Sequence, residues 1–263
     1  MTGFKDKTAV ITGAGSGIGE AIAYQFALRG ANVVLAGRNT ARLEAVSAKC
    51  ASMGAGAFFH TMDAEDPVSI ENFASYLREN GLMPDFLVLN AGISQRGAAL
   101  ESDLSVDRRI MEVNYFGAVS LTKALGDHLR TAKKVNIAVT TSISGLFGFP
   151  LRSAYCASKH ALFGFFESLE TEYPNIRVTF LIPGRINTGI SEHSLTADGR
   201  PYGKMDPGQA NGMSVEKCAV KAIKAIGKEK RRKLIGGKEL LMVQFHRFCP
   251  SIFFRLARKV SPH

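Results

Sequence analysis

The sequence predicts an α/β protein built on a doubly wound, mostly parallel sheet of seven strands, with helices on both faces. Short apolar runs rich in β-branched residues alternate with longer helical stretches. Strands that are buried on both faces read as continuous apolar runs, and this alternation is typical of right-handed strand-helix-strand crossovers. The 26 glycines fall mostly between the runs, which favours short loops.

Seven runs are predicted as strands, at residues 8–12, 32–36, 57–61, 86–90, 135–140, 177–182 and 233–236. The first crossover helix begins in a glycine-rich turn and continues to about Arg29, where Gly30 is a stop signal. A longer helix is predicted over residues 153–172. A chain of 263 residues is long enough for one large domain, and no linker interrupts it. We therefore expect one domain over residues 1–237 and a basic amphipathic extension of it over residues 238–263.

The net charge of +10 is concentrated at the carboxyl-terminal end of the chain. Residues 217–263 hold 13 basic and 2 acidic side chains, whereas the remainder holds 20 basic and 21 acidic ones. A basic surface over the whole protein is therefore not expected, and neither is a nucleic-acid partner. The excess charge indicates a local role for the tail.

The cysteines and histidines show no spacing typical of metal or redox sites. Reduced thiols are expected at the four scattered cysteines, which are Cys50, Cys156, Cys218 and Cys249. The six histidines form no HxxxH or HExxH pair, so no metal site is expected. No apolar run approaches the roughly 20 residues that span a bilayer, and the charged residues 1–7 lead directly into a strand. We expect a soluble, cytoplasmic protein.

A glycine-rich string follows the first strand and opens the first helix. It reads Thr-Gly-Ala-Gly-Ser-Gly-Ile-Gly, and its candidate binding residues are Thr12, Gly13, Gly15, Ser16, Gly17, Ile18 and Gly19. Glycines let a pyrophosphate approach the backbone N–H groups at the positive end of the helix. The TGxxxGxG spacing is more specific than a lone GxGxxG and indicates a Rossmann-type dinucleotide site. The alternative is a tight turn that only requires small residues.

Tyr155 and Lys159 lie four residues apart within the predicted helix 153–172. Positions i and i+4 share one helix face, so the ammonium group can approach the phenol. A free tyrosine has a pKa of roughly 10, and a nearby positive charge favours the ionised form, which suits proton exchange near neutral pH. Ser142 follows the strand 135–140, at the edge where open α/β sheets bind ligands. The alternative, a solvated helix face, is disfavoured by this setting.

Further motifs agree with this interpretation, namely Asn90-Ala91-Gly92 after the fourth strand, Asn114 in Val-Asn-Tyr-Phe-Gly, and Pro183-Gly184 followed by Thr188. With the glycine turn and the trio of serine, tyrosine and lysine, they resemble the short-chain dehydrogenase/reductase family from about residue 7 to about residue 188. The family usually has a second asparagine where this chain has Leu89, a departure that concerns local packing.

The resemblance implies an oxidoreductase that uses a nicotinamide cofactor. Tyr155 is expected to donate a proton to a substrate carbonyl during hydride transfer, or to remove the hydroxyl proton in reverse, while Ser142 holds the oxygen. Lys159 is expected to lower the pKa of Tyr155 and to bind the nicotinamide ribose. Asn114 is expected to connect Lys159 to solvent through water. Taken alone, Asn114 also fits an asparagine inside a helix that bonds its own backbone.

The resemblance also assigns the remaining cofactor contacts. The expected contacts are Asp63 to the adenine, Asn90, Ala91, Gly92, Pro183 and Gly184 as supports, and Thr188 to the carboxamide. Tyr155 and Lys159 belong to the cofactor-binding set as well as to the catalytic set.

Preference between NAD and NADP rests on the residue after the second strand. An acidic residue there accepts hydrogen bonds from the ribose 2′-hydroxyl of NAD. This chain reads Leu-Ala-Gly-Arg-Asn instead, and Arg38 is able to pair with a 2′-phosphate. We predict that NADP(H) is preferred over NAD(H). The alternative is that Arg38 is a solvated loop arginine.

The substrate is less well determined than the cofactor. Residues 143–150 are mainly apolar and aromatic, which favours an apolar ketone, aldehyde or secondary alcohol. Residues 186–212 resemble the mobile substrate loop of the family, with His193 interpreted as a surface residue. The resemblance also favours a homodimer or homotetramer. The natural substrate and the direction of the reaction do not follow from the sequence.

Two amphipathic helices separated by Pro250 are predicted in the tail. Their apolar positions are Leu241, Phe245, Phe248, Ile252, Phe253, Leu256 and Val260, with basic residues between them. Three roles are open, namely packing on the protein or a second subunit, attachment to an anionic membrane surface, and a flap over the substrate. Two alternatives to an enzyme also stand, a catalytically silent NADPH-binding sensor or regulator and a membrane-surface adaptor that uses the basic tail.

Overall fold

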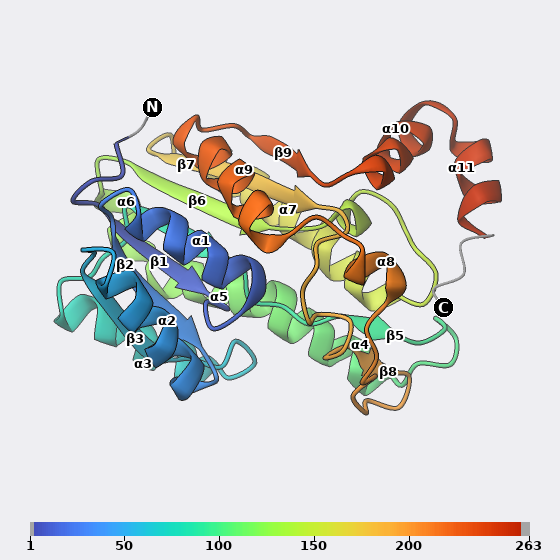
Figure 1. The fold of residues 1–263 in the computed structure, drawn as a ribbon, viewed down its shortest axis with the longest axis horizontal. Helices are drawn as coiled ribbons and strands as arrows, with labels where there is room; N and C mark the ends of the chain where they lie inside the picture. Colours follow the sequence, from blue (N-terminus) through green and yellow to red (C-terminus); the bar gives the residue numbers. More distant parts are fainter. Residues whose placement is uncertain (1–2, 259–263) are drawn as a thin grey trace.

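A parallel sheet of seven strands forms the centre of the computed structural model, which describes residues 3–258 (Figure 1). Its strand order is β3-β2-β1-β4-β6-β7-β9. The strands are β1 (Thr8–Thr12), β2 (Asn32–Gly37), β3 (Ala57–Thr61), β4 (Phe86–Leu89), β6 (Val135–Thr140), β7 (Ile176–Pro183) and β9 (Arg232–Ile235). The predicted fold class is confirmed, and the predicted strand limits agree with these to within one residue.

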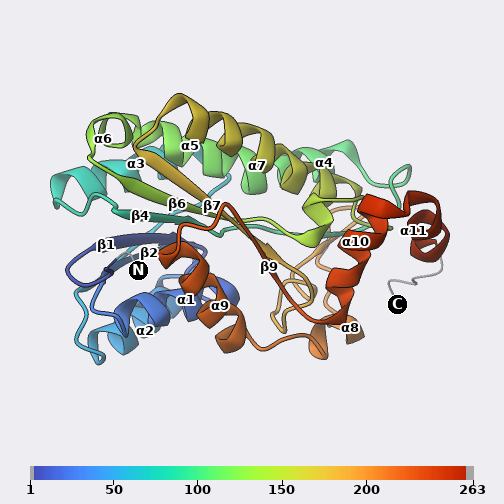
Figure 2. The same ribbon diagram turned by 90° about the horizontal axis from the view of Figure 1, so that it is seen from above.

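Helices cover both faces of this sheet (Figure 2). On one face lie α1 (Gly17–Ala27), α2 (Thr40–Ala51) and α9 (Val215–Gly227). On the other lie α3 (Pro67–Glu79), α5 (Gly117–Ala124), α6 (Gly126–Thr131) and α7 (Ser153–Glu172). Because side chains alternate across a strand, Ile11 packs in the core beneath α1 and Val10 in the core beneath α3. The strand β1 therefore contributes side chains to both hydrophobic cores.

The chain reverses its direction across the sheet between β1 and β4. The strands β1, β2 and β3 extend to one side, whereas β4, β6, β7 and β9 extend to the other. In open α/β sheets, a crevice forms at the carboxyl ends of the strands beside such a reversal. The turns after β1, β4, β6 and β7 therefore meet at one edge.

Short elements extend this edge on the α7 side. A two-stranded sheet pairs β5 (Gln95–Arg96) with β8 (Leu195–Thr196), although their residues are far apart in sequence. Around it lie α4 (Leu104–Met111), the π-helical turn η1 (Glu112–Phe116), the 3-10 turn η2 (Ile143–Gly145) and α8 (Pro207–Ala210).

The tail begins after β9 with a 3-10 turn, η3 (Lys238–Leu240), followed by α10 (Leu241–Phe248) and α11 (Pro250–Ala257). The two predicted helices are thus present, and Val260 lies outside the described residues. Phe253 is buried against Phe147 with ring centroids 4.8 Å apart. Glu239 accepts hydrogen bonds from the backbone N–H groups of Arg185, at 2.9 Å, and Gly237, at 3.0 Å. One face of the tail is therefore packed on the body of the protein.

The helices α10 and α11 lie at one end of the molecule (Figure 1). Six large apolar side chains of the tail are exposed, namely Leu241, Phe245, Phe248, Ile252, Phe254 and Leu256. Among residues 3–258, no helix is long and apolar enough to cross a membrane.

Candidate active site

The glycine-rich turn between β1 and α1 forms the floor of the site. Gly13 and Gly17 have φ values of 63° and 60°, in the left-handed region that favours glycine. A Cβ on Gly19 would lie 2.3 Å from the carbonyl oxygen of Gly13, so any larger residue forces the turn apart. Ser16 caps α1 without a side-chain hydrogen bond to the helix. Its hydroxyl and the first N–H groups of α1 are therefore free to bind an anion.

Thr12 and Asn90 fix the glycine turn to the loop after β4. The Oγ1 of Thr12 accepts hydrogen bonds from the backbone N–H of Asn90, at 2.9 Å, and of Ala91, at 3.1 Å. The Asn90 amide donates to the carbonyl oxygens of Thr12 and Gly13, each at 3.3 Å. These bonds position both loops before any ligand binds, since every partner belongs to the protein.

A cleft of about 960 Å³ runs from the glycine turn to the amino-terminal half of α7. The predicted residues that line it are Gly13, Gly15, Ser16, Gly17, Ile18, Arg38, Asp63, Asn90, Ala91, Gly92, Ser142, Tyr155, Lys159, Pro183, Gly184 and Thr188. Thr12, Gly19 and Asn114 are not in the lining. Thr12 and Asn114 instead border a small adjacent cavity, and Gly19 packs against Gly13.

The residues that line the cleft near Tyr155, where a substrate would bind, differ from those expected. Within the described part of the chain, no residue of 143–150 lines this cleft, and Phe147 instead packs against the tail. Apolar lining comes from Ile93, Ile186 and Ile190. His193 is exposed, as expected, but it does line the cleft. No described residue of the tail lines the cleft, which leaves the flap role unsupported.

Two arginines stand at the end of the cleft beside β2. Arg38 and Arg42 both line it, and neither side chain has a hydrogen bond or ion pair within residues 3–258. The Asn39 side chain caps α2 by accepting from the Arg42 N–H at 3.0 Å. Arg38 is exposed, so both guanidinium groups are available to an anionic ligand.

Tyr155 and Ser142 meet at the other end of the cleft. Ser142 lies just beyond β6 and lines the cleft together with Tyr155. Its Oγ accepts a hydrogen bond from the Ser144 N–H at 3.2 Å. Burial raises the pKa of Tyr155, because the ionised phenol loses hydration there. The Ser142 hydroxyl and the Arg152 and Arg96 guanidinium groups act against this rise in pKa. Burial thus favours the protonated phenol, and its neighbours favour the ionised one.

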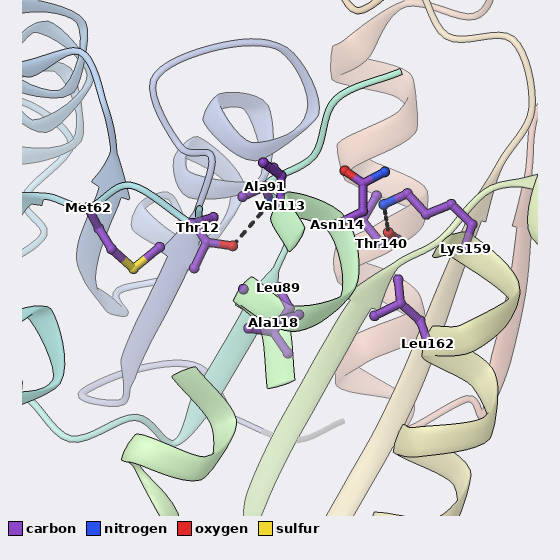
Figure 3. A pocket seen from close by; sticks show the side chains of 12 residues that line it. Thr12, Met62, Leu89, Ala91, Val113, Asn114, Ala118, Thr140, Lys159 and Leu162 are labelled. Carbon is purple, nitrogen blue, oxygen red and sulfur yellow. Dashed lines mark hydrogen bonds between the residues drawn. The ribbon is translucent and has the colours of Figure 1, made fainter. Parts of the chain in front are cut away.

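Lys159 lies beneath Tyr155, with its Nζ 5.9 Å from the centre of the phenol ring. The Nζ donates a hydrogen bond of 2.9 Å to the carbonyl oxygen of Thr140 (Figure 3). Burial lowers the pKa of Lys159 to about 8. Tyr155 and Lys159 therefore share one face of α7, as predicted. The ammonium group is hydrogen-bonded to the backbone at the carboxyl end of β6.

Asn114 stands beside Lys159 in the π-helical turn (Figure 3). Its Oδ1 accepts from the Ile93 N–H at 2.8 Å, and its amide donates to the Ile93 carbonyl at 3.0 Å and to Ser158 at 2.9 Å. These tertiary bonds exclude the alternative in which Asn114 bonds only its own helix. A cavity of about 10 Å³ is lined by Asn114, Thr140 and Lys159 together with mainly apolar residues, and its volume is at the lower limit of the space that one water needs.

Sequence reasoning missed a group of charged residues next to Tyr155. Arg152 and Arg96 both donate to the carboxylate of Asp206. Arg152 precedes Tyr155 by one helical turn, a spacing that would have identified it. No local pattern identifies the other pair, because Arg96 and Asp206 are separated by 110 residues.

The backbone beside this group is strained. Leu151 has a φ of 59°, a conformation that costs a non-glycine residue about 1–2 kcal/mol. The Gly97 N–H holds it by donating to the Leu151 carbonyl at 3.2 Å. Such strain is commonly kept where a functional side chain must be placed.

The residues present fit a dinucleotide cofactor. The glycine turn is a concave backbone surface that a Cβ at Gly13 or Gly19 would fill, and it leaves unpaired donors at the start of α1. The cleft joins this turn to Tyr155, and titratable groups with shifted pKa values at its far end suit proton transfer. The described residues contain no cluster of histidine, cysteine and acidic groups that could hold a metal ion.

Comparison with protein families and curated proteins gives a consistent result. A family model described as short chain dehydrogenase matches residues 7–198. Dehydrogenase/reductase SDR family member 7B of Mus musculus is 40% identical over 259 residues, which cover 96% of this chain and 80% of the relative. Dehydrogenase/reductase SDR family protein 7-like of Anopheles gambiae is also 40% identical, over 261 residues that cover 96% and 82%.

Solved structures share the fold. A short chain dehydrogenase/reductase from Burkholderia phymatum in complex with NAD has a TM-score of 0.83 at 23% identity, covering 100% of this chain and 98% of that one. An alcohol dehydrogenase from Thermococcus sibiricus complexed with 5-hydroxy-NADP has a TM-score of 0.78 at 26% identity, covering 89% and 97%. Similar folds thus carry cofactors with and without the 2′-phosphate.

Proposed function

Because this chain belongs to the short-chain dehydrogenase family, an oxidoreductase family, we propose that it is an NADP(H)-dependent enzyme acting on an apolar carbonyl or secondary alcohol. The observation that carries the proposal is that Tyr155 and Ser142 line one end of a cleft whose other end is the glycine turn. A proton donor and a dinucleotide site in one cleft are the two parts that carbonyl reduction needs.

Different residues of the cleft would bind different parts of the dinucleotide. The α1 amino terminus and Ser16 would hold the pyrophosphate, Asp63 the adenine, and Thr188 the carboxamide. When bound, the nicotinamide supplies a hydride to the carbonyl carbon. The protein must then orient the carbonyl oxygen and provide the proton.

Tyr155 provides that proton in this proposal. Ser142 holds the substrate oxygen next to the phenol, and the phenol transfers its proton as negative charge develops on that oxygen. Lys159 would bind the ribose hydroxyls. The cavity beside Asn114 offers room for the water that would return a proton towards Lys159 and Tyr155.

NADP(H) preference is supported by the charge at the β2 end of the cleft. Arg38 and Arg42 are unpaired there, and the position after β2 carries no carboxylate to bind a 2′-hydroxyl or repel a 2′-phosphate. An apolar substrate is supported by Ile93, Ile186 and Ile190 in the lining.

The tail is proposed to attach the enzyme to an anionic membrane surface from the cytoplasmic side, as an extension over residues 238–263. The tail exposes six large apolar side chains and four basic ones, Lys238, Arg247, Arg255 and Arg258. None of the four has an ion-pair partner among the described residues. Apolar side chains flanked by unpaired cations are what an anionic lipid surface binds. A homodimer or homotetramer is proposed from the family resemblance.

Turnover with a Tyr155→Phe variant tests the function. NADPH and NADH oxidation is followed with a panel of apolar ketones, aldehydes and quinones. Tyr155→Phe should lower kcat by about 10²–10⁴-fold and change the NADPH Kd by less than about threefold, since only the proton donor is lost. Tyr76→Phe, outside the cleft, is the control. Turnover that survives Tyr155→Phe rejects the mechanism, and tight NADPH binding without any turnover favours the silent sensor.

A further inference from the structure

A buried cluster of three charged residues lies beside Tyr155 and takes no part in the chemistry proposed above. The Arg152 Nη2 donates to Asp206 Oδ2 at 2.9 Å, and the Arg96 Nε donates to Asp206 Oδ1 at 3.4 Å. A second Arg96 nitrogen, Nη2, also donates to Oδ2. The Arg96 and Asp206 side chains are only 3% and 8% exposed. The pairs are therefore shielded from the solvent that weakens surface ion pairs.

We propose that the Asp206 carboxylate holds residues 186–212 against the first turn of α7 through its ion pairs with Arg96 and Arg152, a contact that we call the latch. We further propose that Arg96 and Arg152 are positioning residues that favour the ionised form of Tyr155. The consequence for Tyr155 rests on the proposed function. The latch itself does not, because it concerns only how the segment is held.

The latch joins three parts of the chain. Arg96 lies in β5, Arg152 caps the start of α7, and Asp206 lies near the end of the 186–212 segment. The segment lines the cleft through Thr188, Gly189, Ile190, Glu192, His193 and Gln209. Movement of the segment therefore opens the cleft to solvent, and the Asp206 carboxylate is the buried charge that resists this movement.

Backbone contacts and apolar packing also hold the segment, since the Asp103 N–H donates to the Ala197 carbonyl at 2.9 Å and Leu195 is buried beside Val106 and Tyr155. The strand β8 adds two residues beside β5, and the Leu195 N–H donates to the Ser94 carbonyl at 2.9 Å. Within the segment, the Ser191 Oγ accepts a hydrogen bond from the Asp206 N–H at 3.2 Å, which helps to orient Asp206 towards the protein interior. A two-residue strand pair is weak, so loss of the charged contacts should free the segment.

The charges of the cluster do not cancel. Two guanidinium groups share one carboxylate, which leaves one excess positive charge in buried surroundings. The groups that face Tyr155 are Ser142, Arg152, Cys156, Arg96 and Lys159. Arg152 and Arg96 both lower the pKa of Tyr155, against the rise that burial causes. The same residues that hold the segment therefore favour the ionised phenol.

An exposed ion pair in the same segment provides a matched control. Asp198 pairs with Arg200, with side chains 46% and 83% exposed. Removing one aspartate charge at either site changes the net charge equally, but only Asp206 is buried. Lys204 is exposed two residues before Asp206 and offers a trypsin site that reports on the segment.

The first experiment compares trypsin cleavage after Lys204 in the wild type, Asp206→Asn and Asp198→Asn. We expect Asp206→Asn to be cleaved about tenfold faster, because cleavage requires local opening of the segment. Asp198→Asn should stay within about twofold of the wild type. Cleavage of Asp206→Asn at the wild-type rate overturns the latch. If Asp206→Asn does not fold, Arg152→Gln removes one arm of the latch and should accelerate cleavage about threefold, whereas an unchanged rate overturns the proposal.

The second experiment measures the pH dependence of kcat for alcohol oxidation. In the plot of kcat against pH, the rise assigned to ionisation of Tyr155 should occur about one pH unit higher in Arg152→Gln than in the wild type. In Arg152→Lys it should occur close to the wild-type pH. A rise that does not move in Arg152→Gln overturns the role of the arginines in favouring the ionised form of Tyr155. A Tyr155→Phe variant that keeps full turnover instead rejects the proposed function, and the trypsin result still decides the latch.

Discussion

The Nζ of Lys159 donates a hydrogen bond of 2.9 Å to the carbonyl oxygen of Thr140, and the Lys159 side chain is 3% exposed. A single hydrogen bond to a neutral oxygen compensates poorly for the lost hydration of an ammonium group. Lys159 therefore carries a cost to stability that a purely structural residue would not.

The Lys159→Met variant should be more stable than the wild type at pH 7. The pKa falls from 10.5 to about 8 on folding, which corresponds to about 3 kcal/mol against the folded protein when Lys159 is protonated. Between pH 8 and 10.5 the unfolded chain binds more protons than the folded one, so wild-type stability rises relative to the variant. Urea unfolding across this range measures the difference, and parallel curves for the two proteins would contradict it.

The Gly19→Ala variant should disturb the cofactor turn. A Cβ there would lie 2.6 Å from the Asn90 Nδ2 as well as against Gly13, and overpacking of this kind costs about 1–3 kcal/mol. We expect a lower Tm and a weaker NADPH affinity. Gly164→Ala in α7 is the control, because its Cβ meets nothing within 4 Å and should stabilise the helix by up to about 1 kcal/mol. Equal Tm values for the two variants would refute the steric argument.

The Arg38→Ala variant should weaken NADPH use selectively. Loss of charge-assisted hydrogen bonds to a 2′-phosphate corresponds to about 1.5–3 kcal/mol, so the KM for NADPH should rise about 10- to 100-fold. The KM for NADH should be unchanged, because that ligand has no 2′-phosphate. Steady-state kinetics with both cofactors measure this, with Arg29→Ala, outside the cleft, as the control. An equal change in both KM values would count against NADP(H) preference.

Binding of the tail to lipid should depend on its exposed apolar side chains. The protein is expected to bind vesicles that contain phosphatidylserine at low salt and to dissociate as salt rises. Phe254→Ser should weaken vesicle binding about tenfold, since Phe254 is 51% exposed although its ring contacts Phe253 and His246. Its effect on stability should stay within about 0.5 kcal/mol.

Two controls distinguish lipid binding from tail packing. Phe253→Ser should instead destabilise the tail, because Phe253 is 1% exposed and packs on Phe147. Truncation after Gly237 should abolish vesicle binding. A wild-type protein that ignores anionic vesicles would exclude membrane attachment and leave packing on the protein as the role of the tail.

The sequence predicts this protein well where the information is local. The seven strands follow from apolar runs, and the face shared by Tyr155 and Lys159 follows from the helical period. Distant pairs are different. Arg96 and Asp206 are brought together only by the pairing of β5 with β8, and Phe147 meets Phe253 only because the tail folds back. No periodicity in the sequence encodes either contact. Local patterns therefore predict neither the Asp206 latch nor the finding that residues 143–150 do not line the cleft.

Glu239 connects the tail to a loop that lines the cleft. Its carboxylate holds the Arg185 N–H, and Arg185 directly follows Pro183 and Gly184, which line the cleft. A surface that rearranges the tail must therefore also act on the loop that supports the cofactor. Thermodynamic linkage makes this effect reciprocal, so any change in cofactor affinity caused by the surface equals the change in surface affinity caused by the cofactor. Under the proposed roles of the cleft as a cofactor site and of the tail as a membrane contact, the amount of cofactor in solution would regulate where the enzyme resides.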